Sequence, residues 1–576
     1  MPYMPPELLT YIVAKDLTGK DTNRDEFIER LNKFPRSMVI RLCGVLNLLL
    51  SKWTGDYDFE SHAKLARSFF PLPMAERIIK SGRLAFHRHQ LLYVAQEALR
   101  HCDESGRDVA APYWGGFGDV LLMASELLYT PLPKGVTTSE EWARKICLLL
   151  PDMEANGVQS YLLKIVRSYV MTSQFIEPLR GKPNFFDLAA LFEEATGVPL
   201  EVYQALIFGA MTRFIKLDDI KKSNDLASFA VPATWFRSTT VPQPQIERFF
   251  EYVSANADSL AAAVTEKQPV ANDFTIFRNK PLFADVGYFF PLDVAILAEK
   301  FDSGPFWRVH EHLAPEQRGR FHSFWGNVFE DYVNWLFRQC VDGKHNQFYP
   351  NPKYAARPTE QVCDGIMLCG QSAVLIEYKS STFTVGGKYG GNPQELESEL
   401  RRKLVGTPES RKGVHQLADA VEKLCRYENP DKIEGIDMTQ VTTVFPLIIT
   451  RDDLGSALGT NAFLNLHFQE LLKGKRYPRS VTPLFCLSSD DLEKLSAYLP
   501  DCALADVLSA RHKRDKMLQS SFWLVENSVL KKKGERKPTV LVGESGKLGR
   551  MMAERLGLKD DTPRKVESGE PMNRGE

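Results

Sequence analysis

The chain has 576 residues, of which 44% are hydrophobic and 25% charged, and its formal net charge is −1. These values are typical of a folded soluble protein with more than one domain, and they exclude binding of nucleic acid through a strongly basic overall surface. No stretch is apolar for long enough to cross a membrane, and the nine cysteines are scattered without zinc-site spacing. We therefore expect a cytoplasmic protein that does not associate with membranes.

Residues 1–273 are predicted to form a mostly α-helical domain with a recognition or regulatory role. Apolar residues recur at helical spacing in stretches such as SMVIRLCGVLNLLLSKW and NGVQSYLLKIVRSYVMT. Residues 185–214 are predicted to form two helices joined at TGVP, which is compatible with a DNA-binding helix-turn-helix. The second helix carries Leu206, Ile207 and Met211 and almost no polar side chains, so a packed helical hairpin is favoured. A protein partner that binds through this domain is compatible with the sequence.

Residues 274–530 are predicted to form an α/β domain, which begins with the strand-like segment FTIFRNKPLFADVGYFF. A helix is expected over residues 321–340, because Trp325, Phe329 and further apolar residues fall on one face. Glu330 lies at the edge of that face, where it could reach a metal ion at a neighbouring sheet. The alternative for Glu330 is an ordinary residue at the boundary of the core.

The segment VCDGIMLCGQSAVLIEYKSS predicts a β-hairpin with Gly370 and Gln371 as its turn. Pairing outward from this turn places Asp364 opposite Glu377, and Lys379 shares a strand face with Glu377. Three charged side chains therefore meet on one patch among apolar residues, where burial is costly unless they bind something. Because both faces of the hairpin are apolar, we also expect a central sheet covered by helices.

Two carboxylates and one ammonium group on a single patch suit the hydrolysis of phosphodiesters. Carboxylate oxygens are ligands that Mg²⁺ prefers, and a lysine can orient a water molecule and offset charge on phosphoryl oxygens. The alternative interpretation is a salt-bridged pair of strands with no catalytic role. The residue pattern of the hairpin alone favours neither interpretation over the other.

A second helix is expected over residues 411–427, where Gln416 flanks an apolar stripe. Gln416 could contact phosphate or a metal-bound water, and a surface glutamine is the alternative. The strands VTTVFPLIIT and SVTPLFCLS, each followed by a helix, complete the predicted sheet. Between the hairpin and this helix, GGKYGGNP predicts a mobile loop whose Lys388 and Tyr389 could contact nucleic acid.

The last part of the chain, residues 531–576, begins with basic residues and is expected to be a disordered tail. Within it, VLVGESGKLGRMMAERLGL has the outline of a strand, a phosphate-binding loop and a helix. The Walker spacing fails, because Lys547 lies inside the gap between Gly543 and Gly549 and no hydroxyl residue follows for Mg²⁺. Nucleotide binding is therefore a minor alternative.

The candidate residues follow one another in an order that resembles the PD-(D/E)xK nuclease superfamily, which has the restriction-endonuclease-like fold. The residues that carry the resemblance are, in chain order, Glu330, Asp364, Glu377, Lys379 and Gln416. The resemblance covers about residues 280–530 and leaves the rest of the chain outside it. Cys363 stands where the proline of the family's name would be, and that proline is often absent in the family.

The resemblance implies a metal-dependent endonuclease or exonuclease with a central mixed sheet flanked by helices. It implies that Asp364, Glu377 and Glu330 bind Mg²⁺ or Mn²⁺, and that the carbonyl of Tyr378 is a further ligand. Lys379 would then act on the attacking water. Nucleic acid is the implied substrate, DNA in preference to RNA, and a role in restriction or antiviral defence follows from fold analogy alone.

The alternative to an enzyme is a noncatalytic scaffold that keeps the fold and binds nucleic acid or protein. A scaffold needs none of Asp364, Glu377 and Lys379, so their joint presence favours the enzyme. A metal-dependent cleavage assay separates these two functions. The sequence is also compatible with a homo-oligomer.

Overall fold

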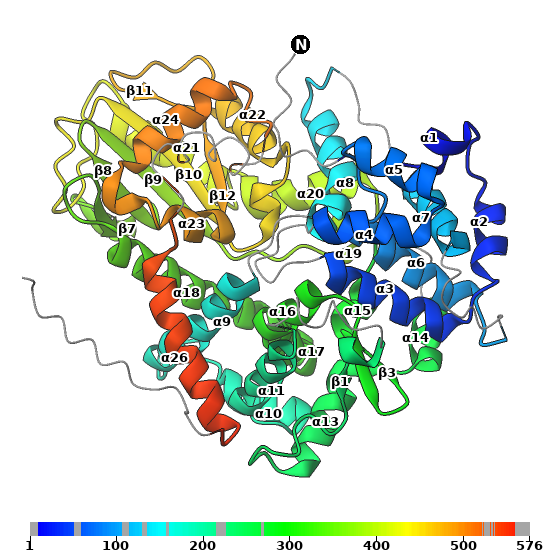
Figure 1. Cartoon of the computed structure of the whole chain (residues 1–576). Coiled ribbons are helices and arrows are strands. Elements are labelled where there is room, and N and C mark those ends of the chain that lie inside the picture. Colours follow the sequence, from blue (N-terminus) through cyan, green and yellow to red (C-terminus); the bar gives the residue numbers. More distant parts are fainter. Residues whose placement is uncertain are drawn as a thin grey trace, which may run out of the picture.

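The computed structural model describes residues 10–50, 59–105, 115–128, 135–156, 161–214, 226–266, 270–520, 522, 530, 534 and 536–558. They form a mixed α/β protein in which a six-stranded sheet with flanking helices lies beside a mostly helical part (Figure 1). The prediction of helices followed by a helix-flanked mixed sheet is confirmed at this level. Within these ranges, no helix has both the length and the apolar character that a membrane span requires.

The central sheet combines antiparallel and parallel strands. Its strands are β5 (Gln347–Pro350), β8 (Gly365–Cys369), β9 (Ser372–Lys379), β10 (Thr443–Thr450), β11 (Ser480–Val481) and β12 (Phe485–Ser488). The strand order is β11–β10–β9–β8–β5, and β12 also pairs with β10. Neighbours β5, β8 and β9 are antiparallel, whereas β9, β11 and β12 all run parallel to β10. The carboxyl ends of β9, β10 and β12 therefore lie at the same edge.

Helices cover both faces of this sheet because its strands are apolar on both sides. Val374 and Ile376 of β9 belong to the core on the side of α18 and α24, whereas Ala373 and Leu375 belong to the core on the side of α21 and α22. The elements around the sheet are α18 (Pro315–Cys340), α19 (Val385–Tyr389), α20 (Pro393–Leu400), the π-helix η3 (Arg401–Val405), α21 (Gly413–Cys425), η4 (Asp453–Ser456), α22 (Thr460–Leu472), α23 (Ser489–Leu495), η5 (Leu499–Asp501) and α24 (Leu504–Arg514), with a small hairpin of β6 (Lys353–Tyr354) and β7 (Arg357–Gln361).

The part of the chain before residue 273 is mostly helical, as predicted, but residues 275–279, which were expected to lie in a strand, form a short helix as well. The helices described between residues 14 and 312 are α1 (Ala14–Thr18), α2 (Arg24–Leu31), α3 (Arg36–Leu50), α4 (Phe59–Phe69), α5 (Leu72–Lys80), α6 (Arg88–His101), α7 (Gly115–Leu128), α8 (Ser139–Asn156), α9 (Tyr161–Gln174), η1 (Glu177–Leu179), α10 (Leu188–Thr196), α11 (Leu200–Thr212), η2 (Leu226–Phe229), α13 (Gln243–Val253), α14 (Ala257–Thr265), α15 (Thr275–Asn279), α16 (Val294–Asp302) and α17 (Gly304–His312). Helices α10 and α11 form the packed hairpin that was favoured over a DNA-reading pair, because Leu206, Ile207 and Met211 are buried.

A second, four-stranded sheet crosses the predicted domain boundary at residue 273. Its order is β1 (Val231–Pro232), β4 (Tyr288–Pro291), β3 (Leu282–Asp285) and β2 (Ser254–Ala255). Strands β3 and β4 were expected to open the α/β domain, but they pair with strands from before residue 273. The boundary at residue 273 therefore falls inside one packed unit.

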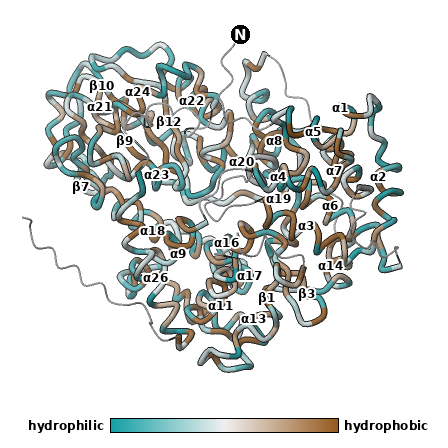
Figure 2. The backbone as a smooth tube through the Cα atoms, viewed as in Figure 1, coloured by the Kyte–Doolittle hydropathy of each residue, from teal (hydrophilic) through white to brown (hydrophobic). Residues whose placement is uncertain are grey.

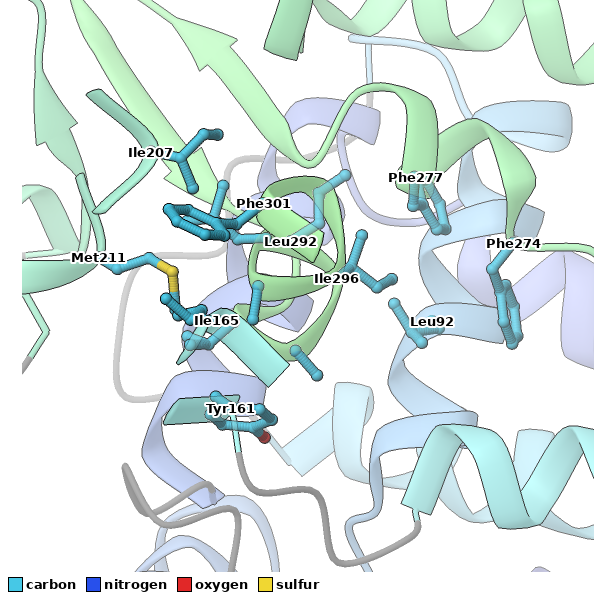
Figure 3. Packing of buried hydrophobic residues seen from close by; sticks show 14 of the residues in the cluster. Leu92, Tyr161, Ile165, Ile207, Met211, Phe274, Phe277, Leu292, Ile296 and Phe301 are labelled. Carbon is cyan, nitrogen blue, oxygen red and sulfur yellow. The ribbon is translucent and has the colours of Figure 1, made fainter. Parts of the chain in front are cut away.

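The apolar core is continuous across that boundary. Figure 3 shows Ile296 and Phe301 of α16 lying among Ile165 of α9, Ile207 of α11 and Leu92 of α6. Figure 2 shows that hydrophobic residues occur along the described helices and strands of both parts. Helix α16 thus joins the helical part to the α/β part through burial of apolar surface.

The tail prediction is wrong for residues 539–555, which form the helix α26 (Thr539–Arg555). Leu541, Leu548 and Met552 are buried, and the helix packs against α9 and α11 (Figure 1). These positions are seven and four residues apart, so they form one helical stripe that the neighbouring basic residues concealed. Because α26 already includes residues 540–542, no strand directly precedes Gly543, and the outline of a strand followed by a phosphate-binding loop is wrong here. Residues 559–576, the rest of the predicted tail, lie outside the described residues.

The glycine-rich segment after β9 is folded rather than a mobile loop. It forms α19, in which Lys388 Nζ lies 3.0 Å from Asp452 Oδ1 and Tyr389 is buried. The guanidinium of Arg278 lies over the Tyr389 ring at 4.9 Å. Both side chains are engaged within the protein, so the expectation that they contact nucleic acid is not supported.

Candidate active site

The predicted hairpin forms with the predicted register. Strands β8 and β9 pair from Cys369 with Ser372 to Gly365 with Ile376, and Gly370 has a φ of 59° as the first residue of the turn. Glycine adopts such a left-handed conformation without steric cost, which fixes the two-residue turn. Asp364 therefore enters β8 beside the end of β9 that carries Glu377.

Lys379 and Glu377 share one face of β9 and contact each other directly. Lys379 Nζ lies 2.8 Å from Glu377 Oε2, and the Glu377 side chain is almost completely buried. The same ammonium group donates a hydrogen bond of 2.8 Å to Gln416 Oε1, because the first turn of α21 packs against this face of the sheet. The structure thus brings together three of the five predicted residues through direct contacts.

Asp364 holds the main chain at the end of β9. Its Oδ2 accepts a hydrogen bond of 2.7 Å from the backbone N–H of Tyr378, and its Oδ1 accepts one of 3.2 Å from Gln361 Nε2. The carbonyl of Lys379 instead accepts from Arg451 on the β10 side. Since the N–H and C=O groups of one strand residue point the same way, the Tyr378 carbonyl faces Asp364. Its predicted role as a ligand agrees with this orientation.

Glu330 approaches the cluster from α18. Its side chain is hydrogen-bonded to Asn351, and the negative charge of Asp364 acts on its carboxyl group. Asn351 also donates its backbone N–H to the carbonyl of Asp364 at 2.9 Å and has a φ of 50°. Asn351 and Gln361 are thus positioning residues that the sequence interpretation missed. The Asn-Pro pair at Asn351 is a turn signal that could have drawn attention to it.

The charges in this cluster are poorly compensated. Burial raises the pKa of Glu377 to about 8, since Lys379 only partly offsets burial and the charge of Asp364 adds to it. Burial and the charge of Asp364 likewise raise the pKa of Glu330 to about 7. Burial opposes the charged form of Lys379, yet the surrounding carboxylates outweigh it and raise the lysine pKa. At neutral pH Glu377 is therefore mostly protonated.

No protein family model, no curated protein and no solved structure matches this chain. What the cluster does therefore has to follow from its own geometry and chemistry.

The donor atoms of the cluster suit a hard divalent cation. Asp364, Glu377, Glu330 and the Tyr378 carbonyl offer oxygen atoms only, which Mg²⁺ and Mn²⁺ prefer. As the side chains stand, no group of three His, Cys, Asp or Glu residues in the described part of the chain meets the spacing of a metal site. Burial raises the pKa values of Glu377 and Glu330 and the charge of Asp364 adds to both shifts, so a bound cation would stabilise the charged forms of these carboxyl groups.

Proposed function

We propose that this protein is a metal-dependent nuclease of the PD-(D/E)xK type that hydrolyses phosphodiester bonds in nucleic acid, with DNA as the preferred substrate. The observation that carries the proposal is the contact of Lys379 Nζ with both Glu377 and Gln416, at 2.8 Å each, beside Asp364 on the paired strand. An aspartate, a Glu-x-Lys pair and a glutamine from the next helix thus meet at one edge of a mixed sheet.

Each residue has a distinct role in this proposal. Asp364 and Glu377 would hold Mg²⁺ or Mn²⁺, with Glu330 and the Tyr378 carbonyl as further ligands. When bound, the cation polarises the phosphate and lowers the pKa of a water molecule. Lys379 orients the attacking water and offsets negative charge on the phosphoryl oxygens. Gln416 keeps the lysine ammonium pointed at the site, since its side-chain oxygen accepts one of the three ammonium protons.

The rival function is a noncatalytic scaffold. A scaffold gains nothing from a buried glutamic acid and two further carboxyl groups that share one lysine, because uncompensated buried charge lowers stability. Strongly perturbed ionisable groups of this kind cluster at functional sites. A role in restriction or antiviral defence rests on analogy between folds and is the most distant part of the proposal.

The decisive experiment combines a cleavage assay with calorimetry. The purified protein should cut DNA in Mg²⁺ or Mn²⁺ and not in EDTA, and Asp364→Asn should lose both cleavage and heat of Mn²⁺ binding because a carboxylate ligand is gone. Asp437→Asn is the matched control, since Asp437 is an exposed turn residue. Equal metal binding by wild type and Asp364→Asn would refute the assigned site.

A further inference from the structure

The half of α18 that leads to Glu330 carries positive rather than negative charge. Between Glu316 and Glu330 the helix has no acidic residue, whereas Arg318 and Arg320 lie in this stretch. Its other exposed positions, beside Arg320, are small or uncharged, as at Gly319, Ser323 and Asn327. The surface of this half-helix is therefore complementary to a polyanion and sterically open.

This half-helix is continuous with the candidate active site. His322, Gly326 and Glu330 are spaced four residues apart and so lie in one row along α18. A Cβ atom at Gly326 would lie only 3.3 Å from Ser380 Oγ, so the helix backbone passes directly beside the residue that follows Lys379. Two turns of helix, about 11 Å, separate His322 from Glu330.

Aromatic rings extend the row at its far end. The His322 ring lies 4.9 Å from the His310 ring of α17, and Trp307 lies 5.5 Å from His310. Trp307 is 38% exposed, which is unusual for so large an apolar side chain. Neither imidazole has a hydrogen-bond partner among the described residues. Burial and the nearby charges of His310 and Lys403 lower the pKa of His322, so its ring is neutral at pH 7.

We propose that single-stranded nucleic acid runs along α17 and α18, with its bases stacked on Trp307 and His322, whose rings are held edge-to-face by His310 between them, and its backbone over Ser323 and Gly326 toward Glu330. This inference rests on the proposed function and names its substrate class. Flat rings beside a positive helix surface bind unpaired bases, whose faces are free, whereas the bases of a duplex are stacked on one another.

We call this proposed path along α17 and α18 the track. Fluorescence anisotropy with a labelled single-stranded DNA and a hairpin duplex of the same sequence tests it. The measurements use a Lys379→Ala background, so that the DNA stays intact. Trp307→Ala combined with His322→Ala should weaken single-strand binding by about tenfold or more, since each stacked base contributes substantially. Ser323→Glu should weaken it as well, because it adds negative charge on the track without disturbing the buried face of α18.

Two matched variants control for general effects. His312→Ala lies on the same helix as His310, but its ring pairs with Glu194, and Gln339→Glu adds the same charge at an exposed position of α18 beyond Glu330. Both should bind single strands like the background protein, and RNA of the same sequence tests whether the sugar matters. Unchanged single-strand binding by the track variants, or preferred binding of the duplex, overturns the track while leaving the nuclease proposal intact. Absence of any binding or cleavage of nucleic acid by the wild type overturns both.

Discussion

Two clusters of charged residues are buried at the same edge of the central sheet, and they differ in how their charges are compensated. One is the candidate active site. The other, the junction network, consists of Lys164 and Arg167 of α9 with Asp453, Asp490 and Glu493. Here Lys164 Nζ lies 2.7 Å from Asp453, and Arg167 lies 2.7 Å from Asp490 and 2.9 Å from Glu493.

Every carboxylate of the junction network thus has a cation in contact, and the hydroxyl of Tyr332 donates a further hydrogen bond to Glu493. In the candidate site Glu377 is the one carboxylate in contact with Lys379, and neither Asp364 nor Glu330 has an ion pair within the described ranges. Glu493 also has a raised pKa, about 7, because burial outweighs Arg167. A raised pKa therefore does not separate the two clusters, but the missing cations do.

The comparison indicates that the junction network is structural and the candidate site functional. The network fastens α9 of the helical part to α23 of the α/β part with a closed set of partners. Under the proposed function, the partners that complete the candidate site come from outside the chain, namely a cation and a phosphate.

The largest expected effect is on cleavage. Lys379→Ala should reduce the cleavage rate at least about 100-fold, because the attacking water loses the group that orients it and offsets phosphoryl charge. Lys379→Arg should not restore the rate, since a planar guanidinium cannot reproduce the geometry of the ammonium group. Lys388→Ala, which removes a lysine bound to Asp452, serves as the control. Wild-type rates in the Lys379→Ala protein would remove Lys379 from the catalytic group.

The next effect sharpens the contrast in stability between the two clusters. Arg167→Met should lower the free energy of unfolding by about 3 to 5 kcal/mol, because Glu493 remains buried without its cation and Asp490 keeps only Lys164, at 3.7 Å. Lys379→Met should change it by less than about 1 kcal/mol, since Glu377 can keep its proton. Urea denaturation in EDTA measures both. Similar losses in the two variants would show that the candidate site is also a structural ion network.

The smallest effect is a dependence on pH in the absence of metal. The pKa of Glu377 is raised, so its stabilising proton is fully held below the ordinary glutamate pKa and lost as pH rises to about 8. Glu377→Gln should therefore become progressively more stable than wild type between pH 5 and pH 8, by as much as ~3 kcal/mol. Lys379 and Asp364 are the charged groups that act on this carboxyl group.

Glu399→Gln provides a control of opposite sign. Burial acts to raise the pKa of Glu399, but the Thr384 N–H and Lys403 outweigh it and hold that pKa low. This variant should be less stable than wild type at pH 7, and the difference should shrink as the pH falls through the acidic range. Thermal melts across the pH range follow both variants, and parallel curves for Glu377→Gln and wild type would contradict the raised pKa.

The positions that the sequence predicted for the candidate residues depend on local geometry. The turn at Gly370 and the alternation of strand side chains are sufficient to set Asp364 opposite Glu377 and to place Lys379 on the same face. The apolar stripes of α18 and α21 likewise predicted that Glu330 and Gln416 lie at the edge of the helix face that packs on the sheet. Each of these inferences spans only a few residues, over which periodicity is a direct physical signal.

The sequence by itself determined the hairpin register, the composition of the site and the alternation of helices and strands around it. Only the tertiary structure decided that α26 packs on α9 and α11, that α19 is ordered by Asp452 and Arg278, and that Asn351 joins Glu330 to Asp364. It also decided that residue 273 lies within a packed unit and that the ring of His322 contacts the ring of His310. These features depend on contacts between residues far apart in the chain, and such contacts form wherever apolar surface can be buried, which local periodicity does not specify.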